Sequence, residues 1–263
     1  MLKLFWRAYE YVAMVVGLGL LALICLTWTP FALLLDPLLP ARTATRVGRL
    51  AICYGFRLYV TLLQVLCACR IDLRAVDELA HEKRPMVIVA NHPSLLDAVI
   101  LVSRLPNAVC IMKGAIAHNL LLGAGARMAR YIVNDAPLSM IRGAIGELRQ
   151  GAVLVIFPEG TRTAAPPVGP CAPTAGLIAA RAGVPVQALV IEMSSLYLGK
   201  GWPLWKPPRL PLRIHVRRGE RFDHIAQPQR FGSEIEVYLR RELGGAATRD
   251  VSVSAVQPDT MQG

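Results

Sequence analysis

The longest uncharged run of the chain extends from Tyr11 to Leu35 and lies between Glu10 and Asp36. As a helix, a run of this length would span about 37 Å, which exceeds the ~30 Å hydrocarbon core of a bilayer. A cleaved signal peptide is the alternative interpretation. Its apolar region would be shorter and a small-residue cleavage site would follow, whereas this run ends in Leu33–Pro37 (L-L-L-D-P). We therefore expect a retained, membrane-embedded helix.

A second apolar stretch, Leu50–Ala68, carries Arg57 near its middle. A central arginine costs about 2.5–3.5 kcal/mol on membrane insertion scales. An in-plane amphipathic helix, or one leg of a re-entrant hairpin, therefore fits this stretch as well as a second span does. We assign residues 1–69 to membrane-anchoring helices and leave the topology of the second stretch open.

The composition indicates a lipid partner and no nucleic acid. Apolar residues make up 54% of the chain, above the usual 45–50% of soluble domains, and the formal net charge is +11. Such a positive excess indicates an anionic partner, either nucleic acid or a phospholipid surface. Aromatic residues are only 6%, without the basic helix or aromatic ladder of a nucleic-acid module. A hydrophobic anchor beside a basic body fits an anionic bilayer better.

The six cysteines form no C-x-x-C pair and have no histidine at zinc-like spacing. We expect free, buried thiols in a reducing compartment, with no disulfide framework and no metal site.

After Arg70, short apolar runs alternate with helical patterns. This alternation predicts an α/β domain over residues 70–225, with a mainly parallel sheet flanked by helices. A C-terminal helix is expected within residues 226–245, ended by Gly244-Gly245. Residues 246–263 are polar and without pattern, so we expect them to be disordered. The expected strands are 86–90, 109–112, 131–133, 153–157, 184–191 and 212–216, and the clearest helices are 137–150, 174–182 and 233–243.

A histidine and an aspartate follow the first of these strands, in the segment Asn91–Asp97 (N-H-P-S-L-L-D). Pro93 fits the first turn of a helix, so we expect His92 near the helix cap, from which its ring can turn toward Asp97. A hydroxyl nucleophile is weak until a base removes its proton, and a neutral imidazole held by a carboxylate can be that base. The alternative is a capping histidine and an unrelated first-turn aspartate.

The strand expected at 153–157 ends in Pro158–Arg162 (P-E-G-T-R). Loops at the carboxyl edge of a parallel sheet bind ligands in open α/β folds. Arg162 can bind a phosphate bidentately, and Gly160 allows a close approach of the backbone. The alternative is a surface turn with a Glu–Arg pair.

Together, the N-H-x-x-x-x-D and F-P-E-G-T-R segments resemble the motifs of the glycerolipid acyltransferases, the 1-acylglycerol-3-phosphate acyltransferases and their relatives. The resemblance covers roughly residues 70–220. It implies that His92 and Asp97 form a catalytic dyad, and that the donor is acyl-CoA or an acyl carrier protein thioester. No further cofactor and no metal is implied. The residues expected to bind the acceptor are Glu159, Gly160, Thr161, Arg162 and Lys113.

One departure from the family pattern concerns the acceptor. The family often has an Asp-Arg pair after the segment that begins near Lys113, and its arginine is associated with the acceptor phosphate. Here the corresponding residues are Asn134 and Asp135, with Arg127 and Arg130 nearby. This departure favours an alternative acceptor without a terminal phosphate, such as an amino-acid lipid.

The function predicted from the sequence is membrane-bound O-acyl transfer to the hydroxyl of a lyso-lipid, with 1-acylglycerol-3-phosphate as the leading acceptor. Backbone N–H groups near the helix start after His92 are the natural donors for the oxyanion of such a reaction. The expected location is the cytoplasmic membrane, with the active site facing the cytoplasm. A non-catalytic lipid-binding membrane protein and a thioester hydrolase are the alternatives.

Overall fold

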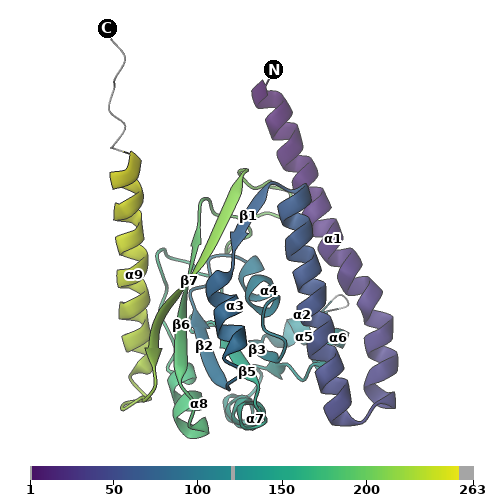
Figure 1. The fold of residues 1–263 in the computed structure, drawn as a ribbon, viewed down its shortest axis with the longest axis vertical. Helices are drawn as coiled ribbons and strands as arrows, with labels where there is room; N and C mark the ends of the chain where they lie inside the picture. The colour runs from purple at the N-terminus through teal and green to yellow at the C-terminus, as the bar shows by residue number, and fades with distance from the viewer. Residues whose placement is uncertain (1, 120–121, 255–263) are drawn as a thin grey trace.

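Two long helices precede the sheet. The computed structural model describes residues 2–119 and 122–254. Helix α1 (Leu2–Leu38) and helix α2 (Ala41–Leu66) pack side by side along one side of the molecule (Figure 1). Both helices are long and apolar enough to cross a membrane, a property that signal sequences and core helices of soluble proteins share. The second apolar stretch therefore lies within a longer helix, and its membrane topology stays open.

The sheet has seven strands in the order β1-β7-β6-β2-β5-β3-β4. Every neighbouring pair is parallel except β6 and β7, which are antiparallel. The predicted fold class, a mainly parallel sheet flanked by helices, is confirmed. The strands are β1 (Cys69–Asp72), β2 (Met86–Ala90), β3 (Ala108–Met112), β4 (Ile132–Val133), β5 (Val153–Ile156), β6 (Val186–Met193) and β7 (Leu212–Phe222).

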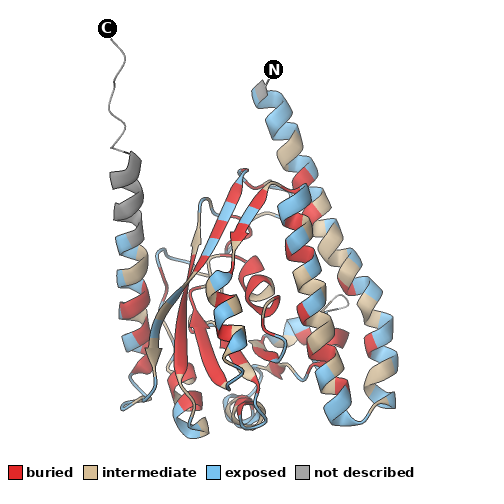
Figure 2. Ribbon diagram, in the orientation of Figure 1, coloured by how far each residue is buried: buried red, intermediate tan, exposed pale blue. Residues whose placement is uncertain are grey.

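Helices cover both faces of the sheet. Side chains of successive strand residues point to opposite faces, so each central strand packs against the helices on both sides. On β2, Met86 and Ile88 pack toward α1, α2, α3 and α4, whereas Val87 and Val89 pack toward α7, α8 and α9. The central strands are consequently buried along their length, as Figure 2 shows. The remaining helices are α3 (Arg74–His81), α4 (Leu96–Val102), α5 (Gly114–Ala117), α6 (Gly123–Met128), α7 (Pro137–Arg149), α8 (Thr174–Ala182) and α9 (Phe231–Ser254).

A buried arginine attaches α2 to the sheet domain. Arg49 is only 5% exposed and forms an ion pair with Glu147 of α7. Its guanidinium also donates to the side-chain oxygen of Asn107 at 2.8 Å and to the carbonyl of Ala129 at 3.1 Å. Beside it, a Cβ on Gly48 would lie 2.8 Å from the backbone nitrogen of Ala129, so only glycine permits this approach. The inner face of α2 is thus fixed to the domain.

The outer face of α1 is a stripe of exposed apolar side chains, visible as pale blue segments along the helix in Figure 2. Phe5, Val15, Leu23 and Leu34 are each more than half exposed. Exposed apolar surface on this scale marks a contact with a membrane or a protein.

The C-terminal helix is longer than predicted. α9 runs through Gly244 and Gly245 to Ser254, so the predicted helix end at these glycines is wrong. Neither glycine has the positive φ that a left-handed helix end requires, and glycine inside a helix costs only about 1 kcal/mol relative to alanine. The predicted disordered tail begins at residue 246. Its first part is helical backbone here, and residues 255–263 lie outside the described part of the chain.

Candidate active site

Asn91 fixes the point at which the chain leaves β2. Its side-chain amide donates to the carbonyl of Ile191 at 2.8 Å, and its side-chain oxygen accepts the N–H of Ile191 at 2.8 Å. The side chain therefore takes the place of a further backbone pair between β2 and β6. This buried anchor sets the direction of the next residue, His92, at the carboxyl edge of the sheet.

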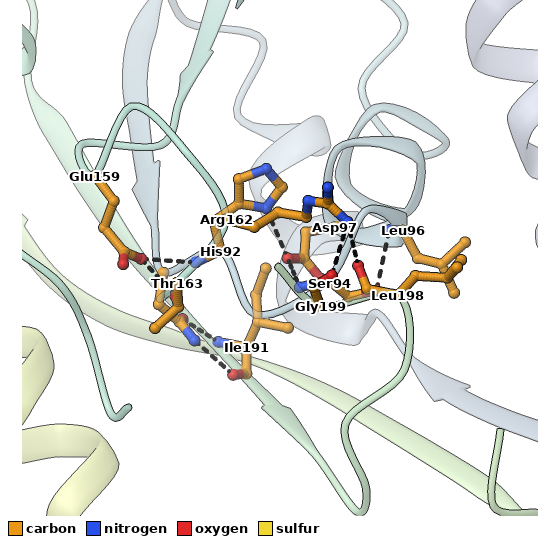
Figure 3. A network of polar contacts seen from close by, with 11 residues as sticks. His92, Ser94, Leu96, Asp97, Glu159, Arg162, Thr163, Ile191, Leu198 and Gly199 are labelled. Carbon is orange, nitrogen blue, oxygen red and sulfur yellow. Dashed lines mark hydrogen bonds and ion pairs between the residues drawn. The ribbon is translucent and has the colours of Figure 1, made fainter. Parts of the chain in front are cut away.

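His92 and Asp97 are in contact, as the segment predicted. His92 Nδ1 lies 2.9 Å from Asp97 Oδ2 (Figure 3). The same carboxylate oxygen accepts the N–H of Ser94 at 2.7 Å. The predicted helix start at Pro93 is wrong, because α4 begins at Leu96. Residues 94–97 instead form a turn, and this turn brings the carboxylate back under the imidazole ring.

Asp97 is completely buried, and its second oxygen, Oδ1, has no hydrogen-bond partner among the described residues. Burial raises the pKa of the Asp97 carboxyl above its ordinary value, while the hydrogen bonds from His92 and Ser94 act in the opposite direction. Keeping the Asp97 carboxylate charged at this buried position therefore costs free energy, and a positive charge on His92 would offset that cost.

The His92 ring is held on one face and accessible at one edge. It stacks on Phe157, with ring centroids 4.0 Å apart and an angle of 16° between the planes. Its side chain is 15% exposed. With Nδ1 donating to Asp97, the neutral ring keeps Nε2 as an acceptor, and this nitrogen points away from the carboxylate (Figure 3). In this arrangement, the neutral imidazole can accept a proton at Nε2.

Glu159 is engaged by protein groups on both oxygens. Oε1 accepts the backbone N–H of His92 at 3.1 Å and the hydroxyl of Thr163 at 2.7 Å. Oε2 accepts the N–H of Gly169 at 2.8 Å. A further bond runs from the N–H of Thr163 to the carbonyl of His92 at 2.7 Å. Glu159 thus joins the loop after β5 to the backbone of His92.

Arg162 reaches the loop between β6 and β7. One terminal nitrogen, Nη1, donates to the carbonyls of Leu198 and Gly199 at 2.9 and 2.8 Å (Figure 3). Between Glu159 and Arg162, Gly160 is exposed and has a φ of +64°. Glycine adopts this left-handed conformation without steric cost, which explains its place in the turn. Thr161 is half-exposed in the same turn.

Lys113 lies farther along the carboxyl edge, directly after β3, and its side chain is exposed. Asp135 approaches the next residue, since a Cβ on Gly114 would lie 2.6 Å from Asp135 Oδ1. The two nearby arginines are engaged elsewhere: Arg127 donates to the carbonyl of Ala117, and Arg130 pairs with Asp36 of α1 at 3.3 Å. Of these three cations, Lys113 is the one whose side chain has neither a hydrogen bond nor an ion pair in the described part of the chain.

The backbone N–H groups at the helix start are all occupied. That of His92 binds Glu159, that of Ser94 binds Asp97 and that of Leu95 binds the carbonyl of Leu198. The N–H groups of Leu96 and Asp97 bind the side chain and carbonyl of Ser94, and Pro93 has none. The predicted oxyanion donors are therefore not free. In contrast, the N–H groups of Thr161 and Arg162 have no acceptor among the described residues.

Sequence reasoning did not assign roles to Asn91, Ser94 or Thr163, which support His92, Asp97 and Glu159. Asn91 and Ser94 lie inside the first motif, and Thr163 directly follows the second. Their position in or beside a motif was the only signal in the sequence that could have indicated these supporting roles. All six cysteines are free, and five of them are buried as expected, whereas Cys171 is half-buried. The described residues contain no group of three or more His, Cys, Asp or Glu side chains suited to a metal ion.

Residues 71–192 match the model of the Acyltransferase family. Over 125 residues, the chain is 28% identical to the chloroplastic 1-acyl-sn-glycerol-3-phosphate acyltransferase BAT2 of Brassica napus. This match covers 46% of the chain and only 36% of that relative. The solved structure of the 1-acyl-sn-glycerophosphate (LPA) acyltransferase PlsC from Thermotoga maritima aligns with a TM-score of 0.60 and 17% identity. The alignment covers 97% of this chain and 100% of that structure, so the two chains share a fold.

Proposed function

We propose, from the match of residues 71–192 to the Acyltransferase family model, that this protein transfers an acyl group from a thioester to the hydroxyl of a lyso-lipid. The observation that carries the proposal is the 2.9 Å contact between His92 Nδ1 and the buried carboxylate of Asp97. This contact leaves one ring nitrogen of a neutral imidazole to accept a proton, which a hydroxyl nucleophile requires.

In the proposed reaction, the acceptor hydroxyl gives its proton to His92 Nε2 as its oxygen attacks the thioester carbonyl carbon. Asp97 stabilises the imidazolium that forms. The tetrahedral oxyanion then collapses, the carbon–sulfur bond breaks, and the thiolate takes the proton from His92. The donor is acyl-CoA or an acyl carrier protein thioester, and no covalent enzyme intermediate is needed.

The turn after β5 is the proposed source of oxyanion stabilisation. The backbone N–H groups of Thr161 and Arg162 have no acceptor in the described part of the chain, whereas those of residues 92–97 are already paired. The bond from the N–H of Thr163 to the carbonyl of His92 keeps this turn beside the base. Free N–H groups held next to the reacting atoms would act without reorganisation.

The leading acceptor is 1-acylglycerol-3-phosphate, which gives phosphatidate. Arg162 and Lys113 at the carboxyl edge support binding of its phosphate. The alternative is an acceptor without a terminal phosphate, such as an amino-acid lipid. It is favoured by Asp135 beside Gly114 and by the engagement of Arg127 and Arg130 in other contacts.

Membrane attachment through α1 and α2 is part of the proposal, with the cytoplasmic membrane as the location and the site facing the cytoplasm. The exposed apolar stripe of α1 supports it. We expect the protein to stay with membranes after a high-salt wash, because salt screens charge and leaves apolar burial intact. Release by salt alone would contradict attachment through these helices.

The test of the function is product analysis by mass spectrometry. The purified protein would receive one acyl thioester with a panel of lyso-lipids, and with no acceptor. Acyl transfer predicts an acylated lipid that depends on the acceptor. Release of free fatty acid at the same rate with and without acceptor would instead identify a hydrolase, and no turnover at all would favour a non-catalytic lipid-binding protein.

The acceptor is tested with Arg162→Ala, assayed on 1-acylglycerol-3-phosphate and on an uncharged lyso-lipid. A selective loss on the phosphate substrate supports phosphatidate synthesis. An equal loss on both substrates, or no activity of the parent protein on the phosphate substrate, favours the other acceptor.

A further inference from the structure

An open hollow of about 310 Å³ lies where the loop between β6 and β7 returns to the sheet. Two serines at the start of the loop and two arginines at its end form its polar lining. None of these residues has been used in the proposed reaction. The lining residues are Ser194, Ser195, Arg209, Leu210, Pro211 and Arg213.

One arginine that lines the hollow, Arg213, has a second arginine beside it on the neighbouring strand. Arg213 on β7 is the register partner of Arg70 on β1, a neighbouring parallel strand about 4.8 Å away. Both side chains are exposed, and they share one face because the residues beside them are buried in the core on the other face. Like charges directly opposite one another destabilise a sheet.

These cations have no counter-charge in an ion pair within the part of the chain that the structure describes. In the described part of the chain, neither Arg70, Arg209 nor Arg213 forms an ion pair, although most other arginines of β7 do. The Oγ atom of Ser194 accepts the N–H of Arg213 at 2.9 Å, so its own hydroxyl proton remains available for donation. Serine hydroxyl and guanidinium donors around an open hollow match the oxygen atoms of a phosphate.

We propose that this hollow is a binding site for a phosphate group, held by Arg209 and Arg213 with the hydroxyl of Ser194, and with Arg70 adding charge beside it. The site is separate from the dyad, but it belongs to the same loop that contacts Arg162 through Leu198.

The other wall of the hollow is connected to the N-terminal helix. The N–H of Leu210 donates to Glu10 at 3.0 Å, and the indole of Trp6 donates to the carbonyl of Leu210 at 3.1 Å. A phosphate bound here would therefore lie between the active-site loop and α1. Two sources carry this chemistry: the head group of an anionic phospholipid and the phosphates of coenzyme A.

The first test is a titration of the full-length protein in detergent with inorganic phosphate at constant ionic strength, followed by thermal unfolding. The melting temperature of the parent is expected to rise with phosphate, because a ligand of the native state stabilises it. Arg209→Gln and Arg213→Gln are each expected to shift the half-maximal phosphate concentration at least tenfold upward. Arg142→Gln, the same charge change on an exposed residue of α7, is the matched control and should respond like the parent.

Arg213→Gln carries a second readout that excludes simple damage to the fold. Without phosphate, its melting temperature should not fall below that of the parent, because the repulsion between Arg70 and Arg213 is removed. An unchanged phosphate response in Arg213→Gln would overturn the site. So would a response that is lost in Arg162→Ala and kept in Arg213→Gln, since phosphate would then occupy the proposed acceptor site.

The source of the phosphate is separated by two further arms. One measures flotation with phosphatidylcholine vesicles with and without phosphatidylglycerol, and the other measures displacement of phosphate by free coenzyme A. The arm in which Arg213→Gln loses the parent's response identifies the source. If neither phosphatidylglycerol nor coenzyme A acts through Arg213, the hollow takes an adventitious ion only and the proposal fails. Acyl transfer in detergent, measured in parallel, keeps this failure distinct from a failure of the proposed reaction.

Discussion

The loop after β2 and the loop after β5 meet at the same edge of the sheet, but they differ in how far their polar atoms are already paired. In the first loop, the outer nitrogen of His92 and the buried Oδ1 of Asp97 have no partner among the described residues. In the second, Glu159 accepts three hydrogen bonds from the protein. The partly exposed outer nitrogen of His92 is available to a substrate, whereas the paired oxygens of Glu159 hold the two loops together.

This difference separates two carboxylates that look equivalent in the sequence motifs. Asp97 contacts the imidazole of His92 and is suited to stabilise a positive charge on that ring. Glu159 binds the backbone of the same histidine and is suited to fix its position. The resemblance to glycerolipid acyltransferases implies that Glu159 binds the acceptor. In this structure an acceptor would have to share oxygens that Thr163 and Gly169 already occupy.

The largest expected effect comes from His92→Ala. Turnover should fall by about 10²–10⁴-fold, the usual contribution of a general base, while the protein stays folded. The measurement is acyl transfer from a thioester, with circular dichroism to verify folding. His224→Ala, at an exposed histidine after β7, is the control and should retain activity. Near-normal turnover in folded His92→Ala would remove the mechanism.

Asp97→Asn should lower turnover by about 10²-fold or more, because an amide cannot stabilise the imidazolium as a carboxylate does. Its thermal stability at neutral pH should not fall, since a buried charge is removed and the amide oxygen can keep the bonds from His92 and Ser94. A large loss of stability together with activity would show that Asp97 is mainly a structural residue.

The raised pKa of Asp97 adds a pH dependence to this comparison. Because the native state holds this proton more tightly than the unfolded state, the free energy of unfolding should fall as pH rises from the ordinary aspartate pKa through the raised native one. Asp97→Asn should lose this part of the slope. Equal slopes in parent and variant, measured by unfolding at a series of pH values, would contradict the buried carboxylate.

The central strands and the dyad could be predicted because their signals are local. β2 and β5 are continuous apolar runs buried on both faces, and His92 directly follows one of them. The edge strand β1 was missed because it reads Cys-Arg-Ile-Asp and has a neighbour on one side only. The start of α4 was misplaced because the turn before it is held by the Asp97 carboxylate, which propensity alone does not describe.

Pairings between distant residues could not be predicted from a single sequence. Arg49 reads as a charge flanking an apolar run, yet it is buried against Glu147 of α7. The oxyanion donors were misassigned for the same reason. The N–H of Leu95 binds the carbonyl of Leu198, which comes from a loop about a hundred residues later and cannot be seen in the motif.

Glu159→Gln tests the supporting role of the second loop. Glutamine keeps one acceptor oxygen but turns an N–H₂ group toward another N–H donor, at Gly169 or at His92. We expect a loss of about 1–3 kcal/mol in stability and about tenfold in turnover, because the base is no longer held in place. A rise in KM for the acceptor with unchanged melting temperature would instead assign Glu159 to acceptor binding.

The smallest expected effect separates two threonines of the same loop. The hydroxyl of Thr163 donates to Glu159, whereas that of Thr161 makes no hydrogen bond among the described residues. Thr163→Val removes a bond to a charged group while keeping the shape and the backbone bond to His92, so it should cost about 1.5 kcal/mol of stability. In a chain of this size the melting temperature should fall by about 3–6 °C, with turnover changed by less than about threefold.

Thr161→Val should leave the melting temperature unchanged, because no internal bond is lost. If Thr161 contacts the acceptor, this variant raises KM for the lyso-lipid, so the two valines separate stability from binding. If Thr161→Val lowered the melting temperature and Thr163→Val did not, hydrogen bonding within this loop would not identify the residues that stabilise it.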